Sequence, residues 1–330
     1  MSDRLRTFLP FLLAAALFLA LALYQLDLPG PNYDEAIEAQ PAIRLLLGQP
    51  VTAHRQAVVR LAGRELPLMV VDYVGGLNIY ALWLFFRLGG IDVATMRLWP
   101  VAVGLVILGL TFRLGRWAGG LGVGFAAAIL LAVHPSYVFF ARQGIYVTNT
   151  TIAFSLAILL ALLRLIATGQ RRWWYLAAFL AGLGLWAKFI MLWPLAATAL
   201  LALPAWRWRE QLGLPVAATF RPRNLFAPSA LAGALAAFGL GMAPLLVFNL
   251  QTGATIRHFL GTLGRSYYGV ANTAYLANLA ARVEQLGHFL RGDHFWYLGG
   301  HFGDPLAPWV WAGGSLVVLA TALTSREVRL

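Results

Sequence analysis

The residues best suited to chemistry are the acids of the segment Pro31–Glu38, which directly follows the first long apolar run. Asp34 and Glu35 stand next to each other there, where apolar residues give way to polar ones. A carboxylate in such a place can act as a general base and take a proton from an acceptor hydroxyl or amine. A simpler interpretation also fits, because the helix dipole favours acids in a first helical turn. The residues alone leave both interpretations open.

A second candidate group lies between two later apolar runs and contains Arg142, Tyr146 and Asn149. A guanidinium pairs bidentately with phosphate oxygens, so Arg142 beside an aromatic side chain suits a phosphate ligand. Two alternatives remain: Arg142 can be an interfacial arginine that reaches out to water, and Asn149 can be a helix N-cap.

A third group, Arg265, Tyr267 and Tyr268, lies in the last polar segment and can line a phosphate or sugar pocket. Its aromatic residues fit equally well in an interface belt of the membrane. The histidines and acids of this segment match no metal-ligand spacing, so we assign none of them as metal ligands. These residues are His288, His294, His301, Asp293 and Asp304.

The composition predicts a membrane protein. Hydrophobic residues make up 60% of the 330 and charged residues only 12%, against about 25% charged in soluble domains. The net charge of +12 comes from arginines in small groups between apolar runs, which is typical of membrane-protein loops and argues against a nucleic-acid partner. The absence of cysteine excludes disulfides and thiol catalysis. The sequence also has no glycine-rich phosphate-binding loop, which argues against a nucleotide-sugar donor.

The apolar runs predict an all-α integral membrane protein with about eight transmembrane helices. The run 68–88, interrupted by Asp72 and Asn78, is assigned to an outer-face interfacial helix, because only then do the basic loops lie on the cytoplasmic side. We therefore expect one membrane domain, residues 1–330, with both termini cytoplasmic and outer-face segments at 27–94 and 251–306. The predicted spans are 7–26, 95–114, 118–138, 151–168, 173–189, 190–206, 228–250 and 307–324.

The order of these features resembles the GT-C glycosyltransferases, and most of all glycosyltransferase family 39, which holds protein O-mannosyltransferases and aminoarabinose transferases. The first span, the Asp-Glu pair and a surface helix are similar to the start of that family. Three later segments also resemble the family: Leu66–Met69, Met96–Pro100, and His134-Pro135 followed by Ala141–Tyr146.

The resemblance implies a GT-C helical bundle in the cell membrane with its active site on the outer face. Asp34 is then the catalytic carboxylate and Glu35 a neighbouring polar contact. An acceptor attacks C1 of a polyprenyl-phosphate sugar, the configuration inverts, and polyprenyl phosphate leaves. The arginines and tyrosines named above would neutralise the departing phosphate. The implied partners are the lipid-linked donor, the bilayer, and an acceptor that is a lipid, glycan or protein; no cofactor is assigned, and a divalent metal stays open.

Two other functions remain as alternatives. A lipid or solute transporter predicts charged or glycine-broken helices at the bilayer midplane and internal repeats, whereas the acids here gather in an outer segment. A non-catalytic membrane partner of the same fold is the second alternative. Thr148 and Asn149 occupy the region where family members often carry an acid, and Asp72 stands where many carry a lysine.

The topology is testable, because the chain has no native cysteine. Single cysteines introduced at positions 60 and 270 should react with an impermeant thiol reagent in intact cells. Those at 115, 172 and 215 should be protected, since they lie in the predicted cytoplasmic loops. External labelling at 115 and 172 would mean that 68–88 spans the membrane, so that Asp34 and Arg142 would face opposite sides.

Overall fold

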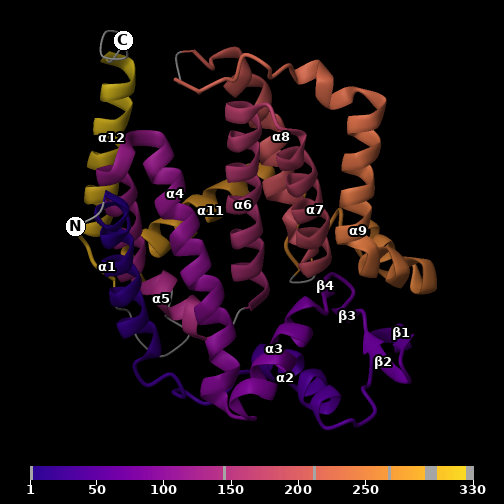
Figure 1. Ribbon diagram of the computed structural model, residues 1–330. Coiled ribbons are helices and arrows are strands. Elements are labelled where there is room, and N and C mark those ends of the chain that lie inside the picture. The colour runs from indigo at the N-terminus through magenta and orange to yellow at the C-terminus, as the bar shows by residue number, and fades with distance from the viewer. Residues whose placement is uncertain (1–2, 144–145, 211–212, 267–268, 294–302, 325–330) are drawn as a thin grey trace. The chain divides into compact units, whose positions relative to one another are not determined.

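A computed structural model describes residues 3–143, 146–210, 213–266, 269–293 and 303–324 (Figure 1). Its contacts divide the chain into two compact units. The first unit comprises Met1–Val133, Tyr137–Pro204 and Pro215–His258, and the second comprises His134–Ser136, Ala205–Leu214 and Phe259–Leu330. We predicted a single membrane domain, which would require the two units to pack together, and this stays a prediction.

The structure is mostly helical. The first unit contains α1 Asp3–Leu23, α2 Tyr33–Leu46, α3 Leu77–Gly89, α4 Val93–Val133, α6 Tyr146–Thr168, α7 Arg171–Ala187 and α9 Pro228–Thr252, with short 3-10 turns at His54–Gln56, Phe189–Met191 and Pro222–Phe226. The second unit contains α11 Tyr275–Arg291 and α12 Ala307–Thr324. Helices α5 Pro135–Arg142, α8 Leu192–Arg207 and α10 Ala254–Gly261 pass from one unit into the other.

Several of these helices are long and apolar enough to cross a membrane, so the chain is a multi-pass membrane protein. By length and composition, four described helices qualify: Val93–Val133, Asn149–Thr168, Phe189–Arg207 and Pro228–Thr252. Phe8–Leu23 and Leu77–Gly89 are shorter apolar helices. The predicted total of eight spans, and their orientation, stay predictions.

Helix α4 is broken near its middle by two glycines. Gly119 and Gly120 have non-helical backbone angles, with φ of −154° and +82°. The two halves then approach each other closely, because a Cβ on Gly115 would lie 2.9 Å from the Cα of Gly124. The break lies inside the predicted span 118–138, near its start, rather than in the gap between the spans predicted at 95–114 and 118–138.

The expectation of an all-α protein is wrong for residues 58–75. Strands β1 Val58–Leu61 and β2 Arg64–Pro67 form an antiparallel hairpin, and β3 Met69–Val71 pairs with β4 Val74–Gly75. The valine-rich sequence favours extended backbone, and Gly63 takes a positive φ of 74° at the first turn. The apolar run 68–88 is therefore a hairpin followed by α3, rather than one helix.

Asp72, which interrupts that apolar run, lies at the β3–β4 turn and is neutralised there. Its carboxylate accepts hydrogen bonds from Arg55 at 2.5 and 2.8 Å, and His54 lies 2.7 Å away. The Arg55 guanidinium holds the pKa of the Asp72 carboxyl well below its usual range. The charge thus anchors the turn to the preceding 3-10 helix.

The β3–β4 hairpin docks against the end of α7. The indole nitrogen of Trp186 donates to the Leu68 carbonyl at 2.9 Å, and the Phe189 amide donates to the Tyr73 carbonyl at 3.0 Å. A Cβ on Gly75 would lie only 1.9 Å from the Trp186 carbonyl oxygen, so this approach requires glycine. The docking fixes the backbone of Lys188, which bridges to Val74.

Helices α7 and α9 also approach through glycines, as is common between membrane helices. A Cβ on Gly182 of α7 would lie 2.1 Å from the Phe238 carbonyl oxygen, and one on Gly241 of α9 would lie 2.3 Å from that of Phe179. In Figure 1 these helices run with α4 and α6, while α2, α3 and the strands gather at one end of them.

The close contact between α7 and α9 can be tested by two glycine substitutions on α9, one of which is a matched control. Gly241→Ala should lower the apparent melting temperature in detergent, because the new methyl group meets backbone and overpacking costs about 1–3 kcal/mol. Gly239→Ala should cause no loss, since within the described residues its added Cβ would meet no neighbouring element within 4 Å, and alanine favours helix. Equal melting temperatures for the two variants would contradict this close packing.

Candidate active site

The start of α2 is fixed by a reciprocal cap, which determines how its acids point. The Asn32 side chain accepts a hydrogen bond from the Glu35 amide at 2.9 Å, and the Glu35 carboxylate accepts one from the Asn32 amide at 2.8 Å. This capping box satisfies two backbone donors of the first turn. Asn32 is therefore the N-cap, Asp34 and Glu35 lie in the first helical turn, and the side chain of Asp34 is exposed.

Glu35 forms a buried bidentate ion pair with Arg97 of α4. Arg97 Nε and Nη2 lie 2.9 and 3.0 Å from the two Glu35 oxygens, and the two side chains are only 1% and 0% exposed. The same guanidinium donates to the carbonyls of Leu26 at 2.9 Å and Gly30 at 3.3 Å. Glu35, predicted as a second site carboxylate, is thus occupied in holding the α1–α2 loop against α4.

Glu38 lies one helical turn after Asp34, on the same face of α2. Its side chain is 5% exposed, and the Oε2 atom has no hydrogen-bond partner among the described residues. Burial raises the pKa of the Glu38 carboxyl to about 8, against the opposing effects of a hydrogen bond with Asn78 and the charge of Lys188. The electric field of Asp34 acts in the same direction as burial.

Lys188 completes this group of charges. It follows α7 directly, is partly buried, and interacts electrostatically with both Glu38 and Asp34. Asp34 and Glu38 of α2 and Lys188 after α7 are therefore close enough for their charges to influence one another. Such a set can accept a proton at one atom and stabilise an anion at another.

Buried polar side chains extend this group into the helices. The Asn78 Oδ1 atom accepts hydrogen bonds from the Trp99 indole at 3.1 Å and the Thr150 hydroxyl at 3.3 Å. Asn149 is buried and donates to the Phe140 carbonyl at 2.6 Å. It lies inside α6, which begins at Tyr146, so its alternative interpretation as an N-cap is wrong.

Arg142 lies at the end of α5 and contacts the chain beyond the end of α1. Its Nη2 atom donates to the Tyr24 carbonyl at 2.5 Å and to the Gln25 carbonyl. Its electrostatic partners are Arg97 and Asp27. Arg142 is therefore a basic group beside the α1–α2 loop, in the same compact unit as Asp34.

The structure says less about the other residues that were predicted to bind the donor. Arg265 lies in the second unit, where its Nε atom donates to the Gly269 carbonyl at 2.9 Å. Tyr146 is the first residue of α6, but its side chain is not described, and Tyr267 and Tyr268 lie outside the described residues. In the parts of the chain that the structure describes, no three His, Asp or Glu side chains form a group that could hold a metal ion.

Sequence reasoning missed Glu38 and Lys188 as site residues. Two signals point to them: Glu38 follows Asp34 at helical spacing, and Lys188 is the only lysine of the chain, at the end of an apolar run. Arg97 was recognised only as part of a resembling segment, because its partner Glu35 lies 62 residues earlier.

The Glu35–Arg97 pair yields a sharp stability prediction. Arg97→Gln should destabilise the protein by about 3–5 kcal/mol, because it leaves the Glu35 charge buried without its cation. Arg60→Gln is the matched control, since it breaks the exposed Arg60–Glu65 pair and should change stability little. Unfolding by denaturant in detergent measures both. A similar effect of the two changes would contradict a structural role for the buried pair.

Part of the chain matches a known protein family. Residues 77–220 match the family described as Dolichyl-phosphate-mannose-protein mannosyltransferase. The matched part includes Arg97, Arg142 and Lys188, while Asp34 and Glu38 precede it. No curated protein and no solved structure matches the chain. The resemblance predicted from the sequence is confirmed over residues 77–220: this part of the chain is similar to a family of GT-C-type membrane glycosyltransferases, which take their sugar from a lipid-linked donor.

Proposed function

We propose that the enzyme transfers a mannosyl group from a polyprenyl-phosphate donor to an acceptor at the outer face of the membrane, with inversion at C1. The observation that carries this proposal is the group formed by Asp34, Glu38 and Lys188. Asp34 is exposed, and Lys188 interacts electrostatically with it and with the buried Glu38. The matched family supplies the class of donor, since its description names a dolichyl-phosphate mannose.

In the proposed reaction, Asp34 acts as the general base. Its carboxylate takes the proton of the acceptor hydroxyl as the acceptor oxygen attacks C1 of the sugar. The bond between C1 and the phosphate oxygen breaks, and its electron pair leaves with polyprenyl phosphate. Attack from the face opposite the phosphate inverts the configuration at C1.

In the proposed reaction, Lys188 stabilises the departing phosphate. Its ammonium interacts with Asp34, so a donor phosphate near it would also lie near the base. A fixed cation at the developing negative charge lowers the barrier without a need to reorganise during the reaction. Glu38 then contributes little competing negative charge near neutral pH, because burial raises its pKa to about 8.

The remaining donor ligands of the proposal are those predicted from the sequence: Arg142, Tyr146, Asn149, Arg265, Tyr267 and Tyr268. Arg142 and Asn149 lie in the same compact unit as Asp34. The ion pair of Glu35 with Arg97 serves this site indirectly, because it holds the loop from which Asp34 projects.

The proposal is tested by Asp34→Asn, which keeps the shape of the side chain and removes the base. Turnover should fall by roughly 10²–10⁴, the usual contribution of a positioned general base, while donor binding is retained. The assay follows transfer or hydrolysis of labelled polyprenyl-phosphate mannose by purified protein in membranes.

Asp27→Asn is the matched control, because Asp27 is an exposed acid of the same loop. It should keep near wild-type turnover. Wild-type turnover in Asp34→Asn would refute the general-base role. A wild-type protein that binds the donor and neither transfers nor hydrolyses it would instead favour the non-catalytic partner.

A further inference from the structure

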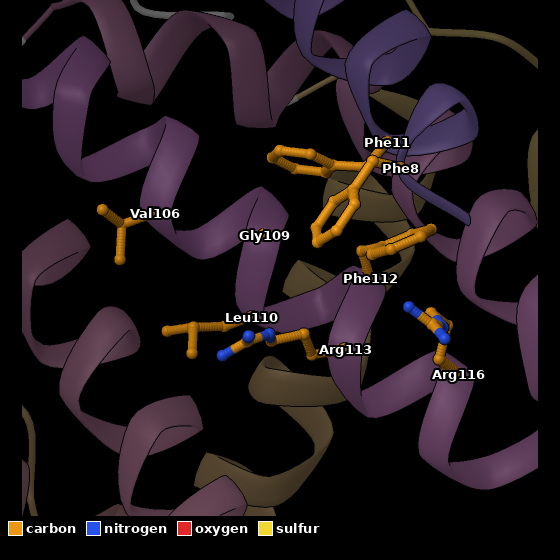
Figure 2. A pocket seen from close by; sticks show the side chains of 8 residues that line it. All are labelled: Phe8, Phe11, Val106, Gly109, Leu110, Phe112, Arg113 and Arg116. Atoms are coloured by element: carbon orange, nitrogen blue, oxygen red, sulfur yellow. The ribbon is translucent and has the colours of Figure 1, made fainter. Parts of the chain in front are cut away.

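An apolar hollow lies between α1 and α4, away from the candidate active site. It has a volume of about 260 Å³ and ends at two arginines, Arg113 and Arg116. Figure 2 shows the rings of Phe8, Phe11 and Phe112 gathered on one side, with the arginines next to them. The lining residues are Phe8, Phe11, Val106, Gly109, Leu110, Phe112, Arg113 and Arg116.

A second hollow of about 260 Å³ adjoins the first, because Arg113 and Arg116 line both. Its other lining residues are Trp117, Leu160 and Arg164, so it reaches from α4 to α6. Three arginines therefore surround one space that continues into an apolar space. We call the two hollows together the arginine-ended groove.

Among the residues that the structure describes, no acidic side chain pairs with the arginines of this groove: none of Arg113, Arg116 and Arg164 has a carboxylate within ion-pair distance. Arg116 lies over the Phe112 ring, 5.7 Å from its centre, which holds it beside the apolar hollow. Three like charges around one space repel each other, and a phosphate that pairs with their guanidinium groups relieves that repulsion.

The groove is separate from the site of the proposed reaction. Phe8 lies near the start of α1, whereas Asp34 follows the end of that helix. Phe8 and Leu23 are 15 residues apart on α1, which corresponds to roughly 22 Å along the helix axis. A lipid in the groove would therefore be distinct from the sugar donor.

We propose that the arginine-ended groove binds an anionic glycerophospholipid, with the head-group phosphate on Arg113, Arg116 and Arg164 and one acyl chain along Phe8 and Phe112. The three arginines favour a negatively charged head group, and the apolar hollow favours an acyl chain over water. Basic pockets between membrane helices are suited to anionic lipid head groups. This inference does not depend on the proposed glycosyl transfer.

Native mass spectrometry of the full-length protein tests the proposal with two probes, phosphatidylglycerol and phosphatidylcholine with identical acyl chains. Wild type should bind phosphatidylglycerol at least tenfold more tightly. The triple change Arg113→Gln, Arg116→Gln and Arg164→Gln should remove this preference, because each charged hydrogen bond contributes severalfold or more to affinity.

The matched control removes three exposed arginines outside the groove: Arg171→Gln, Arg172→Gln and Arg223→Gln. It should keep the preference. A loss equal to that of the first triple would show a general charge effect and overturn the proposal. So would equal binding of the two lipids by wild type, or displacement of phosphatidylglycerol by millimolar inorganic phosphate or by stoichiometric polyprenyl phosphate.

A second variant keeps the test valid if the triple change does not fold. Gly109→Val narrows the apolar hollow, because a Cβ on Gly109 would lie 3.6 Å from the Phe11 ring. It should weaken binding of long-chain phosphatidylglycerol at least fivefold while leaving a short-chain analogue unaffected. Unchanged binding of both lipids would exclude the apolar hollow as the acyl-chain site.

Discussion

The buried ion pair between Glu35 and Arg97 is the interaction on which the arrangement of the site depends. Two charges removed from water repay their desolvation only with good geometry and further hydrogen bonds, and this pair has both. It ties the start of α2 to α4 and to the loop that leaves α1. Because Glu35 is committed inward, the neighbouring Asp34 is directed outward, about 100° further around the helix. Adjacent acids thereby acquire different tasks.

The same helix shows how burial separates two carboxyl groups of similar chemistry. Glu38 lies one turn from Asp34 and is buried, and this burial raises its pKa to about 8, so its neutral form is favoured near neutral pH. Asp34 stays in contact with solvent. A general base must be ionised and accessible, whereas a neutral carboxyl group beside Lys188 leaves the charge of the ammonium for a phosphate.

The parts of the structure that follow from local pattern were predictable from the sequence. The span predicted from hydropathy at 228–250 agrees with α9 to within two residues, whereas the glycine break at 119–120 lies inside the predicted span 118–138. The hairpins at 58–75 were not predicted, because an apolar, valine-rich run of that length fits a helix or a strand until its partner is known. The partners of Glu35 and Lys188 were also hidden, since Arg97 and the β3–β4 hairpin are distant in sequence. Contacts between residues so far apart in the sequence leave no local pattern from which they could be predicted.

The position of Lys188 has a practical consequence for labelling. It is the only side-chain amine of the chain, and the chain has no cysteine. An amine-selective acylating reagent would therefore modify, apart from the N-terminus, a single point beside Asp34 and Glu38. Because the backbone of Lys188 is held by the hairpin, the reagent would sense the occupancy of that space rather than the motion of a loop. The extent of acylation at Lys188 would therefore report whether a ligand occupies the space next to these two acids.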